Sequence, residues 1–131
     1  MTRTIVAGRP SEKQAKIYEI VKRAQERAHR AMKAGAKGKD IDEIARKTIR
    51  DAGFGPCFVH GLGHGVGLEV HEPPSFAATS KDVLVAGNVM TNEPGVYILN
   101  FGGVRIEDTV LVGKDKAEKL TEGPYTLETE E

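Results

Sequence analysis

The chain has 131 residues, a formal net charge of zero, 39% hydrophobic residues and 29% charged residues, a balance typical of one soluble globular domain. The lack of a basic excess and the 5% aromatic content argue against a nucleic-acid partner. No apolar run approaches the roughly 18 residues of a membrane span, so no membrane partner is expected. Cys57 is the only cysteine, so an intrachain disulfide is excluded and a cytoplasmic location is expected. A single cysteine of this kind is more typical of a small buried hydrophobe than of a nucleophile.

The N-terminal part predicts a short strand followed by a long helix. Residues 2–7 are rich in Thr, Ile and Val, which are typical of strands. Ser11 and Gln14 then have the spacing of a capping box, and apolar residues follow at helical intervals. The pattern predicts a helix over residues 11–34 that ends at Gly35, with His29 on its solvated surface.

A second, shorter helix is predicted over residues 39–52, and Gly53 ends it. Its inward-facing residues are Ile41, Ile44, Ala45, Thr48 and Ile49.

After Gly53 the chain becomes rich in Gly, Val and Pro, and strands are predicted over residues 83–92, 95–99 and 104–112. Residues 100–103 form a tight turn between the last two strands. Residues from Glu122 onward are acidic with little to bury, and we expect them to fray. The order of elements predicts an α+β fold, an antiparallel sheet with two helices packed on one face.

The densest group of chemically active residues is a histidine cluster. His60, His64 and His71 fall within twelve residues, separated by alternating glycines that disfavour a helix and indicate an extended segment approached closely by another. Neutral imidazole is a common metal ligand and the usual acid or base near pH 7. A glycine-rich connector with surface histidines explains the spacing equally well.

Two later segments place carboxylates at or near strand ends. Glu93 precedes a Pro-Gly turn, where an exposed turn residue is the simpler interpretation. In residues 104–112, period-two alternation puts Arg105 and Glu107 on one face, either an exposed sheet face or one that lines a metal site. One imidazole and two carboxylates form a mixed N/O ligand set, which suits Mn, Co, Fe or Zn better than a closed structural zinc site.

The order and the residues of these segments resemble the sequence motifs of the pita-bread metallopeptidases, the family of methionine aminopeptidase, aminopeptidase P, prolidase and creatinase. The matching segments are His60-Gly-Leu-Gly-His64-Gly-Val-Gly with His71-Glu, Thr91-Asn-Glu93-Pro-Gly, and Gly103-Val-Arg105-Ile-Glu107-Asp-Thr. They are most similar to the prolidase and aminopeptidase P branch. The resemblance implies half of a pita-bread domain over residues 1–122, followed by an acidic C-terminal tail over residues 123–131.

The resemblance also implies a role for each motif residue. His64, Glu93 and Glu107 would bind a divalent metal, with Glu107 bridging two ions and Glu93 also moving protons. His60 and His71 would contact the substrate, and Arg105 would support the region of Glu107. The implied reaction is metal-assisted hydrolysis of an Xaa-Pro peptide bond.

Departures from the family pattern are as informative as the match. Two aspartate ligands of the family lie upstream of the segment that matches Thr2, Arg3 and Thr4, and Met1 precedes that segment directly. Asn92 stands where the family has an apolar residue, and Lys37 where a Thr commonly caps the second helix.

These departures favour an engineered, reconstructed or truncated half-domain that forms a homodimer in place of the missing half and has weak or no peptidase activity. The alternatives are one half of a split peptidase that needs a partner chain, and a non-catalytic protein-interaction module. A nucleotide-binding loop is excluded, because neither GxGxxG nor GxxxxGK occurs.

Overall fold

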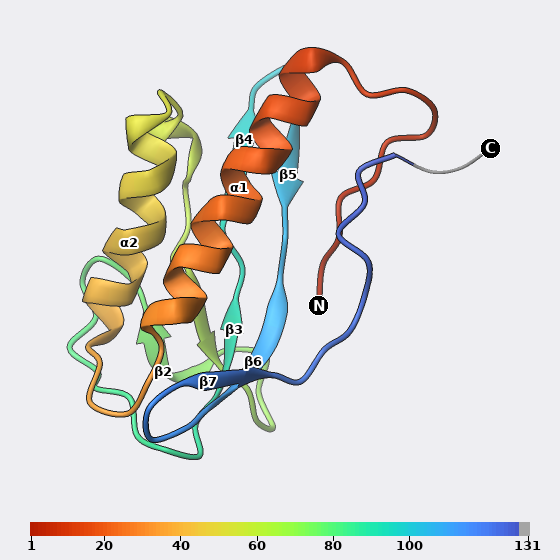
Figure 1. Ribbon diagram of the computed structural model, residues 1–131. Coiled ribbons are helices and arrows are strands. Elements are labelled where there is room, and N and C mark those ends of the chain that lie inside the picture. The colour runs from red at the N-terminus through yellow and green to blue at the C-terminus, as the bar shows by residue number, and fades with distance from the viewer. Residues whose placement is uncertain (129–131) are drawn as a thin grey trace.

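A computed structural model describes residues 1–128 of the chain and has the predicted α+β architecture. Two helices, α1 (Glu12–Ala31) and α2 (Gly38–Asp51), pack against each other and cover one side of an antiparallel sheet (Figure 1). Within the described residues, no helix is long and apolar enough to cross a membrane.

The start of α1 was predicted correctly, but its end was not. Ser11 accepts a hydrogen bond from the Gln14 amide, and the Gln14 side chain accepts one from the Ser11 amide, which completes the capping box. The helix ends at Ala31 rather than Ala34, because the Met32 amide closes a tighter turn on the His29 carbonyl and later amides bond outside the helix. Ala34 donates to Gly113 and Gly35 donates to Leu84, so this segment fastens the helix to the loops beside the sheet.

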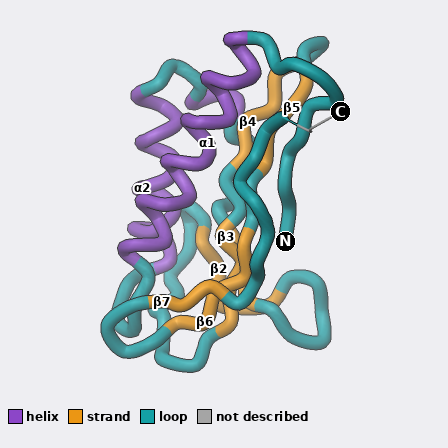
Figure 2. Tube along the Cα trace, turned by 45° about the vertical axis from the view of Figure 1, so that its right-hand side comes forward, coloured by secondary structure: helices purple, strands orange, loops and turns teal. Residues whose placement is uncertain are grey.

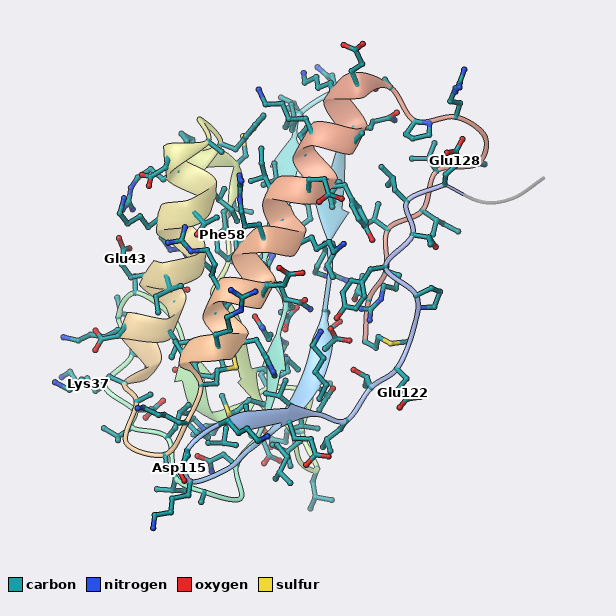
Figure 3. The ribbon with its side chains drawn as sticks, in the orientation of Figure 1. Lys37, Glu43, Phe58, Asp115, Glu122 and Glu128 are labelled. Atoms are coloured by element: carbon teal, nitrogen blue, oxygen red, sulfur yellow. The ribbon has the colours of Figure 1, made fainter. Side chains whose placement is uncertain are left out.

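Helix α2 lies within one residue of its predicted bounds. Gly53 follows it with a φ of 88°, a conformation that favours glycine. Lys37 occupies the N-cap position and, within residues 1–128, provides no side-chain cap, as the sequence indicated. The outer face is charged, with Glu43 projecting into solvent (Figure 3). The inner face buries Asp42 together with the predicted residues, except Ile44, which is half-buried.

Five strands form the main sheet, in the order β2-β1-β3-β6-β7, and two more form a separate hairpin. The main sheet comprises β1 (Gly63–Gly65), β2 (Glu72–Phe76), β3 (Val89–Asn92), β6 (Asp108–Val112) and β7 (Ala117–Lys119). The hairpin comprises β4 (Gly95–Ile98) and β5 (Gly102–Arg105), and a short 3-10 helix spans Gly55–Cys57.

The strand predictions identified the inward-facing residues correctly but gave the wrong strand lengths. Residues 83–92 were predicted as one strand, yet only Val89–Asn92 pair in the sheet, and Gly87 turns the chain with a φ of 96°. Residues 104–112 divide between β5 and β6, with Ile106 and Glu107 in the break. The alternation holds across this break, because Val104, Ile106, Asp108 and Val110 are all buried and the intervening residues are not.

The two ends of the described chain run side by side (Figure 2). Residues 2–7 form an extended arm with single bridges at Thr2 and Val6 rather than the predicted strand. The expectation that the chain frays from Glu122 onward is wrong for residues 122–128, because Tyr125 and Leu127 pack against the core. Figure 3 marks this segment with Glu122 and Glu128. Residues 129–131 of the predicted tail lie outside the described part, and the boundary at residue 122 stays a prediction.

Three single residues differ from, or refine, the expectations. His29 is half-buried rather than solvated, and its Nδ1 is buried without a hydrogen-bond partner in the described part of the chain. Cys57 is half-buried against the core. Asn92 is 1% exposed, and its amide group donates to the carbonyl of Gln25 in α1 at 3.0 Å. The sheet therefore connects to α1 through polar groups as well as apolar contacts.

Candidate metal centre

A pocket gathers most of the predicted site residues at the junction of the main sheet and the hairpin. It is lined by His60, Gly61, Gly63, His64, His71, Glu93 and Arg105. These residues come from β1, from the loops beside it, from the end of β3 and from β5. The three motifs, separate in the sequence, therefore meet in one place.

His64 is held on β1 by three contacts. Its backbone amide donates to the Thr91 hydroxyl at 3.0 Å, and its Nδ1 lies 2.9 Å from the Gly65 carbonyl oxygen. A carbonyl oxygen can only accept, so Nδ1 carries the proton. The opposite nitrogen, Nε2, lies 3.1 Å from Glu93 Oε1.

The glycines around His64 allow this approach. A Cβ atom at Gly63 would lie 2.1 Å from the Thr91 carbonyl oxygen, which is too close for any side chain. The predicted close approach of another segment to this glycine-rich strand is confirmed, and that segment is β3.

Glu93 is not an exposed turn residue. It follows the last residue of β3, its amide donates to the Leu62 carbonyl at 2.9 Å, and its side chain is 17% exposed. Thr91, two residues earlier on the same face, donates its hydroxyl to Glu93 Oε1 at 2.9 Å. The carboxylate is thus oriented toward His64 from within the sheet.

Glu107 lies outside the residues that line the pocket, in the break directly before β6. Asn92 pairs with Asp108, so the next position of the same antiparallel register sets Glu93 opposite Glu107. Side chains at such positions leave the same face with Cβ atoms about 5 Å apart. The Glu107 carboxylate turns instead to the Thr2 hydroxyl, which donates to its Oε2.

His60 is bound at both ring nitrogens. Nδ1 lies 2.7 Å from the Gly61 carbonyl and carries the proton, so Nε2 accepts from the Tyr97 hydroxyl at 2.8 Å. Tyr97 also bonds to Arg105, and this bond is the main reason that the pKa of the guanidinium lies above its ordinary value. Tyr97, on β4, was missed in the sequence because no polar pattern marks it.

His71 is exposed and reaches the pocket from the loop between β1 and β2. Its ring centroid lies 4.4 Å from that of His64. The structure therefore brings His60, His64, His71, Glu93 and Arg105 together, and leaves Glu107 outside this pocket, directly before β6.

Comparison with known proteins identifies the family to which these motifs belong. The family model for metallopeptidase family M24 matches residues 1–114. The chain belongs to metallopeptidase family M24. An Xaa-Pro dipeptidase from Pyrococcus furiosus is 54% identical over 121 residues, which are 92% of this chain and 35% of that protein.

Solved M24 structures share the fold closely. The prolidase from Pyrococcus furiosus matches with a TM-score of 0.91 and 53% identity, over 93% of this chain and 36% of its own. The Xaa-Pro dipeptidase from Bacillus anthracis matches with a TM-score of 0.93 and 46% identity, over 95% and 35%. This M24 chain thus spans about a third of the length of these relatives and corresponds to their C-terminal, pita-bread part.

The donor chemistry of the pocket fits a divalent metal, but the ligand set is not assembled. Within residues 1–128, no three His, Cys, Asp or Glu side chains lie close enough together to hold an ion. His64 and Glu93 are close, and the register of β3 with β6 sets Glu107, directly before β6, on the same face as Glu93. Imidazole and carboxylate are the kinds of side chain that bind Mn, Co, Fe or Zn.

Asp108, the residue after Glu107, is fully buried and was not recognised as important in the sequence. Burial alone would raise the pKa of its carboxyl. Hydrogen bonds from Tyr125, Arg3, Gln25 and Thr121 outweigh that effect and hold the pKa at about 2. The alternation of residues 104–112 places Asp108 at an inward position, so the sequence could have indicated a buried carboxylate that needs partners. The partners themselves could not be predicted, because they come from distant segments.

Proposed function

We propose that this M24 chain provides the C-terminal part of a divalent-metal site that hydrolyses Xaa-Pro peptides. In this proposal His64, Glu93 and Glu107 bind the metal, which is Mn, Co, Fe or Zn. His60 and His71 contact the substrate, and Arg105 supports the region of Glu107. The proposal is supported by the pocket that His64 and Glu93 share with His60, His71 and Arg105, and by the similarity to proteins named Xaa-Pro dipeptidase and prolidase.

One contact carries the proposal. With Nδ1 of His64 protonated, a neutral ring presents a lone pair at Nε2 to the Glu93 carboxylate 3.1 Å away. Two acceptors at that distance repel each other unless a positive charge lies with them, either a proton on Nε2 or a cation between them. Ligand atoms about 2.1 Å from one metal ion are roughly 3 Å apart, so the spacing suits a shared ion.

The residues of this chain have separate tasks in the proposed reaction. A bound divalent ion would supply Lewis-acid chemistry for peptide hydrolysis. Glu93, oriented by the Thr91 hydroxyl, accepts the proton of the attacking water at Oε1 or Oε2. Arg105 adds a fixed positive charge, and His71 is free to move toward a substrate because it is exposed.

We further propose that the chain associates with a second copy, as the resemblance suggested. Large apolar side chains are exposed on the arm and on the hairpin, among them Ile5 at 60%, Leu99 at 90% and Phe101 at 42%. Exposed apolar side chains close together are typical of an interaction surface. A strictly monomeric mass at high micromolar protein would contradict this part of the proposal.

The first experiment measures metal binding. Titration with Co²⁺, followed by visible absorption and by native mass spectrometry, should show a bound ion in the wild type. Glu93→Gln should lose it, while Glu43→Gln, a surface control on α2, should retain it. Equal absorption in wild type and Glu93→Gln would exclude Glu93 as a ligand.

The second experiment measures hydrolysis of an Xaa-Pro dipeptide, with a dipeptide that lacks Pro as the control substrate. Weak or no turnover by the chain alone, together with bound metal, agrees with the proposal. Turnover that appears only after the preceding part of the Pyrococcus furiosus Xaa-Pro dipeptidase is added indicates one half of a split peptidase. No metal binding in any combination would leave the non-catalytic interaction module.

A further inference from the structure

A buried polar cluster surrounds Asp108 on the side of the sheet that faces α1. The Asp108 cluster consists of Arg3, Gln25, Asp108, Thr121 and Tyr125. Asp108 accepts hydrogen bonds from all four other members. Arg3 and Gln25 donate at 2.8 Å and Thr121 at 2.9 Å, and Tyr125 completes the set. A carboxylate taken out of water is tolerated only with such full pairing, so these four groups are held together.

Arg3 connects the cluster to Glu107. All five of its N–H donors have acceptors. One terminal nitrogen donates to the Asp108 carboxylate and to the Gly123 carbonyl, the other to the carbonyls of Glu107 and Thr2, and Nε to that of Pro124. The guanidinium also stacks on the Tyr125 ring, 4.1 Å from its centroid. A lysine has three donors on one atom and cannot reproduce this planar array.

The segment that Arg3 fastens is the one that holds the Glu107 side chain. Thr2 and Glu107 exchange two backbone hydrogen bonds, of 3.1 and 2.9 Å. The Thr2 hydroxyl donates to Glu107 Oε2 and accepts from Arg105 Nε at 3.3 Å. The Glu107 carboxylate, 15% exposed, therefore contacts two groups of a separate chain segment, the Thr2 hydroxyl as a hydrogen-bond donor and the Met1 amino group at 3.7 Å.

We propose that the Asp108 cluster is a positioning device for Glu107, in which Arg3 docks the N-terminal arm so that the Thr2 hydroxyl sets the direction of the Glu107 carboxylate. Arg3, Asp108 and Thr2 are positioning residues, because they act through Glu107. The link to metal binding rests on the proposed function, whereas the link between Arg3 and the backbone of Glu107 does not.

The metal-independent test is amide hydrogen exchange in the full chain. Arg3→Lys keeps the charge and loses the array of donors, so the Glu107 amide, bonded to the Thr2 carbonyl, should exchange at least about tenfold faster. Ile49→Val, a buried change in α2, corrects for a general loss of stability. Tyr125→Phe is a milder second variant in case Arg3→Lys does not fold. Exchange at Glu107 no faster than in Ile49→Val would overturn the proposal.

The metal-dependent test compares variants that keep or lose the Thr2 hydroxyl, so that an effect on the orientation of Glu107 can be distinguished from an effect on folding. Thr2→Val should weaken Mn²⁺ binding roughly tenfold in calorimetry, the usual scale for a residue that orients a ligand, while Thr2→Ser should bind like wild type. Equal affinities in the Val and Ser variants would overturn the role of Thr2. If the wild type itself binds no Mn²⁺, the proposed function fails, and the exchange experiment still decides the positioning role.

Discussion

Two buried Arg–Asp pairs hold the two sides of the candidate site, and they differ in how far apart their members lie in the chain. Asp42 and Arg46 are four residues apart on α2, while Arg3 and Asp108 are 105 residues apart. Arg46 donates to both Asp42 oxygens, at 2.8 and 3.0 Å, and to the carbonyls of Phe58 and His60. Asp42 also accepts from the Leu62 amide at 3.0 Å.

Each pair therefore fixes the backbone beside a candidate site residue, His60 in one case and Glu107 in the other. The Asp42 pair needs only a folded α2, with the loop after it, and one helix face presents both side chains. The Asp108 pair forms only when the N-terminal arm, α1, β6 and the C-terminal segment have met. Local pairs can form early in folding, whereas this distant pair depends on the complete chain.

The largest expected effect is at the distant pair. Asp108→Ala removes the acceptor for four donors and leaves the Arg3 charge buried at 11% exposure. Loss of one partner of a buried pair lowers the free energy of unfolding by about 3–5 kcal/mol. Urea denaturation followed by circular dichroism measures the change, with Glu43→Ala on the surface as the control. A loss below about 1 kcal/mol would show that the pair is not important for stability.

A smaller loss is expected at the local pair. Asp42→Ala should lower the free energy of unfolding by about 2 kcal/mol, because the Arg46 side chain is 22% exposed and can reach water once its partner is removed. The same urea series provides the measurement. In addition, the Leu62 amide should become less protected from hydrogen exchange, while the Glu107 amide stays unchanged. Equal deprotection of both amides would mean that the two pairs are not independent.

The third prediction concerns His29, half-buried beside the Asp108 cluster. Burial is the main reason that its pKa is lowered, Lys119 adds to the effect, and Asp108 opposes it. The unfolded state takes up a proton at an ordinary histidine pKa of about 6.5, whereas the folded state resists it. This contribution to stability is therefore present above pH 6.5 and is lost as the pH falls below it.

His29→Leu removes that loss, since leucine has no proton to bind and no unpaired nitrogen to bury. The variant should be more stable than wild type at pH 5 by about 1 kcal/mol and closer to it at pH 7. Thermal unfolding at several pH values between 5 and 7.5 gives the comparison. Parallel curves for the two proteins would show that His29 does not contribute to the pH dependence.

The smallest expected effect is a gain in stability from a change at the N-terminus of α2, the helix that contains Asp42 and Arg46. Lys37→Thr should add the missing N-cap of α2 and raise the free energy of unfolding by about 0.5–1 kcal/mol. Lys37→Ala, which removes the charge without adding a cap, is the matched control. The same gain in both variants would assign the effect to charge rather than to capping.

The helices and the alternation of strand faces followed from the sequence. Ser11 with Gln14 marked the start of α1, Gly53 marked the end of α2, and residues 104–112 kept their inward and outward order. Of the residues in the histidine and carboxylate motifs, His60, His64, His71, Glu93 and Arg105 line one pocket and Glu107 does not, and their functional roles stay predictions. The helices and the alternation depend on groups within a few residues of one another, so the order of residues is enough to define them.

Other features were decided by tertiary structure alone. Residues 83–88 have the composition of a strand, but in the described part of the chain they form only a single bridge, between Val83 and Lys37. The strand predicted over 104–112 breaks where its first part pairs with β4 and its second with β3. Tyr97 joins the site, and Arg3 joins Asp108, only because sheet pairing brings distant segments together. The sequence by itself therefore determined the local elements and the kinds of polar side chain that the motifs carry. The pairing of strands and the burial of charges across the chain decided which side chains meet, because those interactions depend on separations that no local pattern records.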